Sequence, residues 1–182
     1  MKKFVLVSGG FDPLHQGHLA YLEAAYLLGD GLIVGLNSDA WLTRKKGKGL
    51  LTWDDRAAVL NALWMVDEVW AFDDADGSAV DLLKKAVDVF PDSRFVFANG
   101  GDRDAGNIPE MAFDDYRLDF RFGVGGSDKI NSSSDILADY RTWVVDGVTG
   151  VIQQEVDGWV RQPSFSYPKA LTELIEKIKE NK

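Results

Sequence analysis

Cysteine is absent from this 182-residue chain, so the protein forms neither disulfides nor thiolate metal sites. That absence is compatible with a reducing cytoplasm, which is the location we expect. No apolar run approaches the roughly 20 residues of a membrane-spanning helix, and the first residues lack a signal-peptide pattern. The G-x-x-x-x-G-K-[ST] string is also missing, which excludes a P-loop kinase. Because neither a membrane span nor a signal peptide is evident, we expect no membrane partner.

Positive charge is also in short supply. Twenty basic side chains stand against 29 acidic ones, which gives a formal net charge of −9. Nucleic-acid binding needs a basic face that displaces counterions, so this balance argues against a nucleic-acid partner. Taken alone, it also argues against a phosphate-bearing substrate. The residues are 46% hydrophobic and 12% aromatic, a composition that predicts a packed globular protein rather than a disordered one.

Strand and helix patterns alternate along most of the chain. Short apolar runs predict buried strands, and apolar residues at three- and four-residue spacing predict helices. We expect strands at 4–7, 32–36, 69–72, 94–98 and 118–124, and helices at 17–28, 52–64 and 78–90. Such alternation predicts an α/β fold, a Rossmann-like doubly wound parallel sheet with helices on both faces. Ligands of such sheets bind beyond the carboxyl ends of the strands.

The pattern changes after about residue 140. We therefore expect one domain over 1–140 and a C-terminal extension over 141–182. Asp146-Gly147 and Asp157-Gly158 stand between apolar residues, which predicts hairpin turns. Pro168 is expected to open a final amphipathic helix.

The two histidines of the chain, His15 and His18, stand three residues apart where the first strand passes into the first helix. At that spacing both imidazoles can face one spot, and Gly17 leaves room for a ligand to approach the backbone. Free N–H groups and the helix dipole favour an anion there. The plainer alternatives are that two surface histidines happen to be neighbours, or that one of them caps the helix. Another alternative is a metal pair, for which no third ligand of matching spacing is evident.

The string from Gly10 to His18 closely resembles the HxGH signature of the nucleotidyltransferase superfamily. Further segments resemble that superfamily in the same order along the chain. The closest resemblance is to two enzymes: glycerol-3-phosphate cytidylyltransferase, and the adenylyltransferase domain that makes ADP-heptose. These segments are Asn37-Ser38-Asp39, Lys46-Gly47-Lys48-Gly49, Asp55-Arg56, Gly100-Gly101-Asp102 and Ser132-Ser133-Ser134. The resemblance covers roughly residues 4–140.

This resemblance implies a Rossmann-like enzyme in which a substrate phosphate attacks the α-phosphorus of an NTP, with Mg²⁺, and releases pyrophosphate. The implied acceptor is a small phosphorylated substrate such as a sugar phosphate or glycerol phosphate, and a homodimer is implied as well. The residues leave open whether the NTP is ATP or CTP. The implied catalytic residues are His15, His18 and Lys46. The implied nucleotide-binding residues are Gly9, Gly10, Phe11, Lys48, Arg56, Gly101, Asp102, Arg103, Lys129, Ser132, Ser133 and Ser134, with Asp12 and Asp39 near the acceptor or the metal.

Each of these groups also has a plainer interpretation. The basic cluster Arg44–Lys48, expected on a loop after the second strand, could be a solvated lysine run, and the serines could simply cap a helix. Arg56 falls in a first helical turn, where a cation is unfavourable, which suggests a phosphate or carboxylate partner or merely an exposed side chain.

Two departures from the family pattern leave a second hypothesis open. Relatives often have an arginine before the serine cluster, where this chain has Lys129, and lysine and tyrosine beside the Gly-Gly-Asp, where it has Asn99 and Arg103. The alternative is a catalytically inactive nucleotide-binding module with a regulatory or assembly role. A fragment of a class I aminoacyl-tRNA synthetase, which also carries His-x-Gly-His, is disfavoured by length and negative charge.

Overall fold

The computed structural model describes residues 1–101, 103–126 and 132–160. The chain divides into two compact units, of which the first comprises Met1–Ser133 and the second begins at Ser134. Helix α5 (Ser133–Val160) runs through position 140, where we predicted the domain boundary. The helix predicted from Pro168 lies outside the described residues. Within the ranges given above, no helix combines the length and apolar character needed to cross a bilayer.

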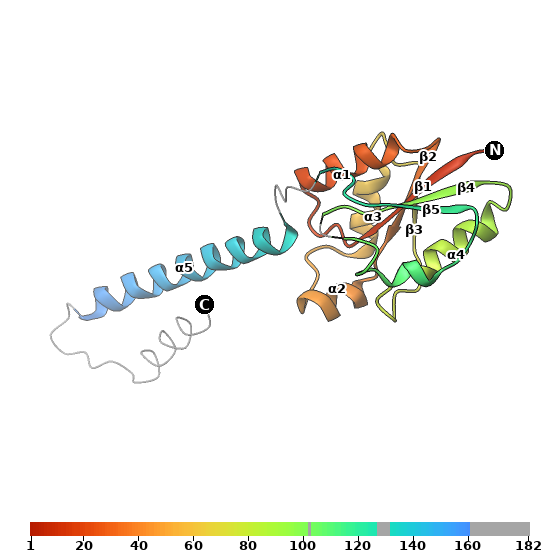
Figure 1. Ribbon diagram of the computed structural model, residues 1–182. Coiled ribbons are helices and arrows are strands. Elements are labelled where there is room, and N and C mark those ends of the chain that lie inside the picture. Colours follow the sequence, from red (N-terminus) through yellow and green to blue (C-terminus); the bar gives the residue numbers. More distant parts are fainter. Residues whose placement is uncertain (102, 127–131, 161–182) are drawn as a thin grey trace. The chain divides into compact units, whose positions relative to one another are not determined.

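The first unit is built on a five-stranded parallel sheet (Figure 1). Its spatial order is β3-β2-β1-β4-β5, so the strand order reverses at β1. The carboxyl ends of β1 and β4 therefore border the crevice in which doubly wound sheets bind ligands. This architecture confirms the predicted Rossmann-like α/β fold. The strands are β1 (Lys3–Gly9), β2 (Gly31–Leu36), β3 (Glu68–Trp70), β4 (Arg94–Ala98) and β5 (Leu118–Arg121).

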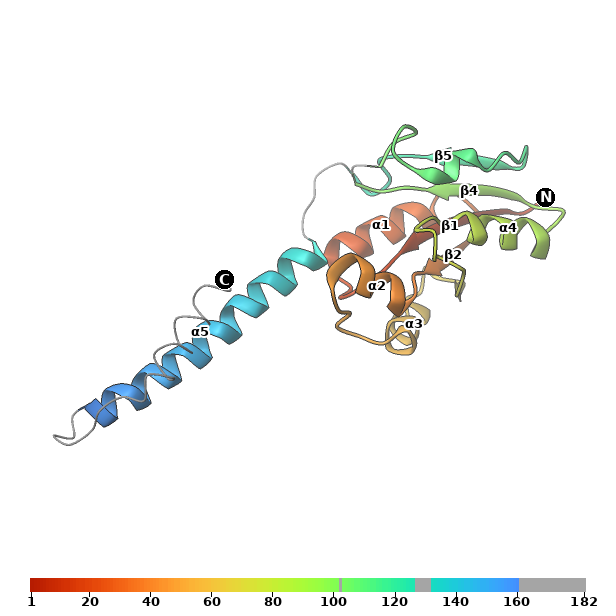
Figure 2. The same ribbon diagram turned by 90° about the horizontal axis from the view of Figure 1, so that it is seen from below.

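Helices cover both faces of the sheet (Figure 2). Successive side chains of a strand point to opposite faces. Val5 and Val7 of β1 thus pack with α1 (Gln16–Tyr26) and α3 (Trp53–Asn61), whereas Leu6 packs with α4 (Val80–Val89). β2 is buried along its whole length, as its continuous apolar sequence predicts. The two apolar layers hold the strand ends, and hence the site, on a rigid base.

The predicted start of α3 is confirmed, but its predicted end is wrong. Thr52 is the N-cap residue: its Oγ1 accepts from the Asp55 N–H at 3.2 Å and donates to the Asp55 carboxylate at 2.6 Å. The helix ends at Asn61, so Trp64 lies beyond it. The Trp64 side chain, which falls within the range predicted for this helix, is exposed.

Helix α4 begins two residues later than predicted. Its N-cap residue is Ala79 rather than Ser78, whose hydroxyl donates to the Asp76 carboxylate at 2.8 Å and accepts from the Val80 N–H at 3.3 Å. The Ala79 N–H at the helix start donates instead to Oε1 of Glu110, at 2.6 Å. A residue 31 positions away along the sequence thus satisfies a group at the helix end.

A short helix, α2 (Asp39–Lys46), stands where we predicted a loop carrying the basic cluster. Ser38 is its N-cap residue, and the Ser38 Oγ accepts from the Trp41 N–H at 3.0 Å. Leu42 is its buried residue, so the apolar spacing that identifies most helices is missing from the sequence. The basic residues fall in the last turn, where the helix dipole favours cations.

The two hairpin turns predicted in the extension are wrong, because α5 continues through Asp146-Gly147 and Asp157-Gly158. Apolar residues at Ile136, Tyr140 and Val144 recur at helical spacing. A glycine inside a helix costs about 1 kcal/mol relative to alanine, which a long helix tolerates. The Asp-Gly pairs therefore do not stop this helix.

Candidate functional site

The two histidines lie together at the start of α1. His15 is the N-cap residue, and its Nδ1 accepts from the Gly17 N–H at 3.1 Å. The rings of His15 and His18 are stacked, with centroids 3.8 Å apart, and the ring of Phe11 contacts His18 edge-on at 5.0 Å. The capping role that we had set as an alternative thus coexists with the clustering of the imidazoles.

Both imidazoles are held in the neutral form. Burial, followed by the charges of His15 and Lys46, lowers the pKa of His18 to about 3. Burial and the charge of Lys46 also lower the pKa of His15. A neutral imidazole offers one N–H donor and one acceptor nitrogen. The Nδ1 of His18 is buried and makes no hydrogen bond to the described residues.

Lys46, the last residue of α2, reaches the histidine segment. Its Nζ donates to the Asp12 carbonyl oxygen at 2.8 Å. Burial lowers the pKa of the Lys46 amine, an effect that Asp12 opposes and Arg56 reinforces. Gly47, with φ +80°, ends the helix, and the Lys48 side chain beyond it is exposed. Of the two predicted lysines, Lys46 is the one that contacts the histidine segment.

Asp12 fixes the backbone of this region. Its side chain is fully buried, and its carboxylate accepts from the N–H groups of Leu50, at 2.8 Å, and Leu51, at 3.0 Å. These bonds tie the segment after α2 to the loop after β1.

Gly9 and Gly10 stand at the end of β1. Gly9 is the last residue of the strand. A Cβ on Gly10 would lie 2.8 Å from the Leu42 side chain, so the glycine permits α2 to pack against the histidine loop. We predicted both glycines as nucleotide contacts, and here Gly10 also allows two segments of the site to approach each other.

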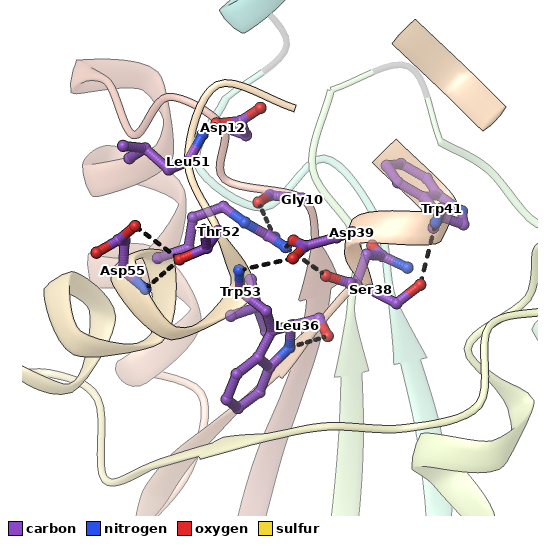
Figure 3. A network of polar contacts seen from close by, with 12 residues as sticks. Gly10, Asp12, Leu36, Ser38, Asp39, Trp41, Leu51, Thr52, Trp53 and Asp55 are labelled. Carbon is purple, nitrogen blue, oxygen red and sulfur yellow. Dashed lines mark hydrogen bonds and ion pairs between the residues drawn. The ribbon is translucent and has the colours of Figure 1, made fainter. Parts of the chain in front are cut away.

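Arg56 is buried among the strand ends rather than exposed to a ligand. Its guanidinium donates to the carbonyls of Gly10, at 2.7 Å, and Asn37, at 3.0 Å, and pairs with Asp39 at 2.7 Å. Figure 3 shows Gly10 and Asp39, which this network joins. The carboxylate partner that we considered for Arg56 is therefore present. Arg56 thus positions the loops after β1 and β2, and its nucleotide contact stays a prediction.

A tyrosine that the sequence did not single out supports the end of β4. The Tyr21 hydroxyl, on α1, donates to the Ala98 carbonyl at 2.6 Å, and burial raises its pKa. A Cβ on Gly100 would lie 2.9 Å from the Tyr21 ring, which explains why a glycine occupies this position. Tyr21 thus links the histidine helix to the turn that carries Gly101 and Arg103. Nothing in the sequence signalled Tyr21 beyond its helical spacing.

The structure describes some, but not all, of the remaining residues that we predicted at this edge of the sheet. Gly101 adopts φ +66°, and Arg103 is exposed. The Ser133 Oγ, at the start of α5, donates to the Pro13 carbonyl at 3.0 Å, which brings it to the histidine loop. Ser132 precedes that helix and Ser134 is exposed. Asp102 and Lys129 lie outside the described residues.

The carboxylates near the histidines do not form a ready metal cage. No three histidine, aspartate or glutamate side chains gather as a metal site in the part of the chain that the structure describes. Both oxygens of Asp12 accept backbone N–H groups, and those of Asp39 accept from Arg56 and from the Trp53 N–H. Mg²⁺ keeps several waters and often binds mainly through substrate phosphates. These residues therefore fit an ion carried by a nucleotide better than a resident ion.

Comparison with known proteins adds an independent line of evidence. The sequence model of a family described as cytidylyltransferase-like matches residues 6–124. The bifunctional protein HldE of Campylobacter concisus is 52% identical over 75 residues, which are 40% of this chain and 16% of that protein. The HldE protein of Pseudomonas fluorescens is 44% identical over 103 residues, 56% of this chain and 20% of that protein. The matched part is thus about a fifth or less of these relatives.

A solved structure shares the fold. The lipopolysaccharide core biosynthesis protein of Thermoplasma volcanium superposes with a TM-score of 0.52 at 24% identity, covering 70% of this chain and all of that one. At this identity the likeness concerns the fold alone. It agrees with the parallel sheet described above.

Proposed function

The chain belongs to the cytidylyltransferase-like family of nucleotidyltransferases, and on that basis we propose that it transfers a nucleoside monophosphate from a Mg²⁺–NTP complex to a small phosphorylated acceptor. The proposed acceptor is a sugar phosphate or glycerol phosphate. The Lys46-Gly47-Lys48-Gly49 and Asp55-Arg56 segments support this choice, because they resemble enzymes that use such acceptors.

The proposed step is an in-line displacement at the α-phosphorus. An oxygen of the acceptor phosphate forms a bond to the α-phosphorus, and the bond from that phosphorus to the bridging oxygen of the β-phosphate breaks. The electron pair leaves with pyrophosphate. A phosphate acceptor is already an anion at neutral pH, so the step needs no general base. The work left to the protein is positioning and stabilisation of charge.

The observation that carries the proposal is the approach of Lys46 to the stacked histidines at the carboxyl edge of the sheet. Lys46 Nζ lies 2.8 Å from the Asp12 carbonyl. His15 and His18, three and six residues after Asp12, stack with their ring centroids 3.8 Å apart. One cation and two neutral N–H donors thus converge on one loop. Because the site is partly withdrawn from water, such donors stabilise developing negative charge more strongly than they would in bulk solvent.

The experiment is a pyrophosphate-release assay with ATP and CTP against a panel of sugar phosphates and glycerol phosphate. We expect release that requires both Mg²⁺ and an acceptor, and that falls at least 100-fold in His18→Ala. Release from no pair of substrates, or an unchanged turnover in His18→Ala, would reject the proposal. Tight NTP binding without release would favour the inactive binding module.

The nucleotide can be identified separately from the acceptor. A ligand that binds only the folded state stabilises it, by about 2.7 kcal/mol at 100 times its Kd, and therefore raises the melting temperature. We expect one of ATP and CTP to raise it more than the other in the presence of Mg²⁺.

We also propose a homodimer, as the family resemblance implies. The mass of one chain is 20.2 kDa. Exposed apolar side chains on α5, among them Tyr140, Trp143 and Val148, are compatible with an association surface. Light scattering on the eluting protein is expected to give twice the chain mass, and a single-chain mass across the concentration range would contradict this proposal.

A further inference from the structure

Asp74 is a buried carboxylate, 3% exposed, that neither the sequence motifs nor the proposed step uses. It follows β3 and faces the start of α2. Its Oδ2 accepts from the Ser38 N–H at 2.7 Å and the Asn37 amide at 3.1 Å, and its Oδ1 accepts from the Ser38 hydroxyl at 2.7 Å. Burial alone would raise the pKa of Asp74, but these hydrogen bonds and the charge of Arg44 lower it overall. The carboxylate is therefore ionised at neutral pH.

The same residue also holds the other end of α2. The Arg44 guanidinium, in the last helical turn, donates to the Asp74 carbonyl at 2.7 Å and pairs with its carboxylate at 3.5 Å. Ser38, held by the carboxylate, is the N-cap residue of the same helix. Residue 74 thus contacts α2 through its side chain at the helix start and through its backbone two residues before Lys46.

Helix α2 is held by few other contacts, chiefly those of Asp39 with Arg56 and with the Trp53 N–H. It comprises Asp39–Lys46, and Leu42 is its buried residue. Helices this short are not stable in isolation, so tertiary contacts must define their position. Because the apolar contact is small, polar contacts must supply much of the remaining constraint, and those of Asp74 reach both ends of the helix.

From these contacts we infer that Asp74 is a positioning residue, which places α2 so that Lys46 reaches the loop carrying His15 and His18. The chain of contacts runs from Asp74 to Ser38 and Arg44, through α2, to the bond of Lys46 with the Asp12 carbonyl. The catalytic consequence rests on the proposed function. The structural consequence, the placement of Lys46, does not.

The test substitutes Asp74→Asn and compares it with Asp76→Asn. Asp76 lies in the same segment and accepts two hydrogen bonds from Ser78, but it makes none to α2. Asparagine keeps the shape of Asp74 and places an amide N–H toward groups that are themselves donors. Both variants are assayed well below their melting temperatures.

The first readout is the midpoint of Lys46 acetylation against pH, followed by mass spectrometry with Lys2 as the exposed reference. In the wild type we expect a midpoint below the ordinary lysine value, because burial lowers the pKa of Lys46. Asp74→Asn should move the midpoint up toward the ordinary value, and Asp76→Asn should not. Loss of a nearby negative charge alone would move it down, so an upward shift reports the release of Lys46 into solvent.

The second readout is steady-state kinetics. We expect Asp74→Asn to lower kcat by about 10- to 100-fold with a small change in the KM for NTP, since Lys46 is proposed to act on the transition state. Asp76→Asn should retain the wild-type kcat. If the wild type has no transferase activity, the proposed function falls, and the acetylation midpoint alone decides the role of Asp74.

A second variant keeps the inference falsifiable if Asp74→Asn does not fold. Ser38→Ala removes the hydroxyl between the Asp74 carboxylate and the Trp41 N–H. The same upward shift for Lys46 is expected, though smaller. An unchanged midpoint in whichever of these variants folds would overturn the inference, as would a kcat within twofold of wild type in Asp74→Asn.

Discussion

At the scale of single residues, His18 has a proton equilibrium that should be visible in stability. Its pKa is about 3 in the folded protein, because of burial and the charges of His15 and Lys46, and an unfolded histidine titrates near 6.5. Between these values the unfolded chain binds a proton that the folded chain does not. The free energy of unfolding should therefore fall as pH decreases from about 6.5 toward 3.

Urea unfolding at pH 7 and pH 5 measures this effect. We expect the wild type to lose more stability between the two pH values than His18→Gln, which cannot titrate there. The aspartates with lowered pKa values act at lower pH, so they affect both proteins equally in this window. Equal losses in the two proteins would show that His18 does not carry this proton linkage.

Lys46 and Lys48 should differ in the kinetic parameter that they affect. Lys46 contacts the loop of the histidines, whereas Lys48 is exposed beyond the helix end. Lys46→Met should lower kcat by about 100-fold, the usual loss for a donor to transition-state charge. Lys48→Met should mainly raise the KM for NTP. Steady-state kinetics with saturating acceptor separate the two, and the reverse ranking would mean that the wrong lysine has been assigned.

At the scale of elements, the start of α3 offers a prediction on stability. Thr52→Ala removes the hydroxyl that accepts from the Asp55 N–H, and loss of such a cap costs about 1 kcal/mol. Thr43→Ala is the control, because its hydroxyl donates to the Asp39 carbonyl on an exposed helix face and its removal should change stability by less than about 0.5 kcal/mol. Thermal or urea unfolding gives both values. Equal effects would contradict the capping role.

The sequence predicts those elements whose signal is local. β1 and β2 are continuous apolar runs, and Thr52 with Asp55 forms a cap within four residues, so these features were predictable. Helix α2 was missed because its stability depends on contacts with Asp74, a residue 30 or more positions away. α5 was misread because Asp146-Gly147 favours a turn locally, whereas the helical spacing extends over many residues.

In the candidate site, too, features with a local sequence signal were predictable and those that depend on distant residues were not. The spacing of His15 and His18 was enough to predict that they cluster. The role of Arg56 was not predictable, because whether a first-turn arginine contacts a ligand or Asp39 depends on the fold around it. Tyr21 and Asp74 have no motif, and their roles emerge only when the strand ends are brought together in space.

At the scale of the whole molecule, the net charge of −9 repels an anionic substrate, whereas the local basic groups attract it. Salt screens exposed charges over about 10 Å at 0.1 M, so it weakens whichever field dominates at the site. We expect the basic groups around α2 to dominate. The KM for NTP should therefore rise several-fold between about 0.05 and 0.3 M salt at constant free Mg²⁺. A KM that falls with added salt would show that the net negative charge governs binding.

The central claim is transfer of a nucleoside monophosphate to a phosphate oxygen, and phosphorus NMR of a complete reaction tests it most directly. With Mg²⁺, the preferred NTP and a sugar or glycerol phosphate, the account predicts two products in equal amounts: pyrophosphate and a diphosphate in which the α-phosphorus is joined to the acceptor. In His18→Ala both should form at least 100 times more slowly. Release of NDP or of free NMP, with the acceptor phosphate unchanged, would contradict the account.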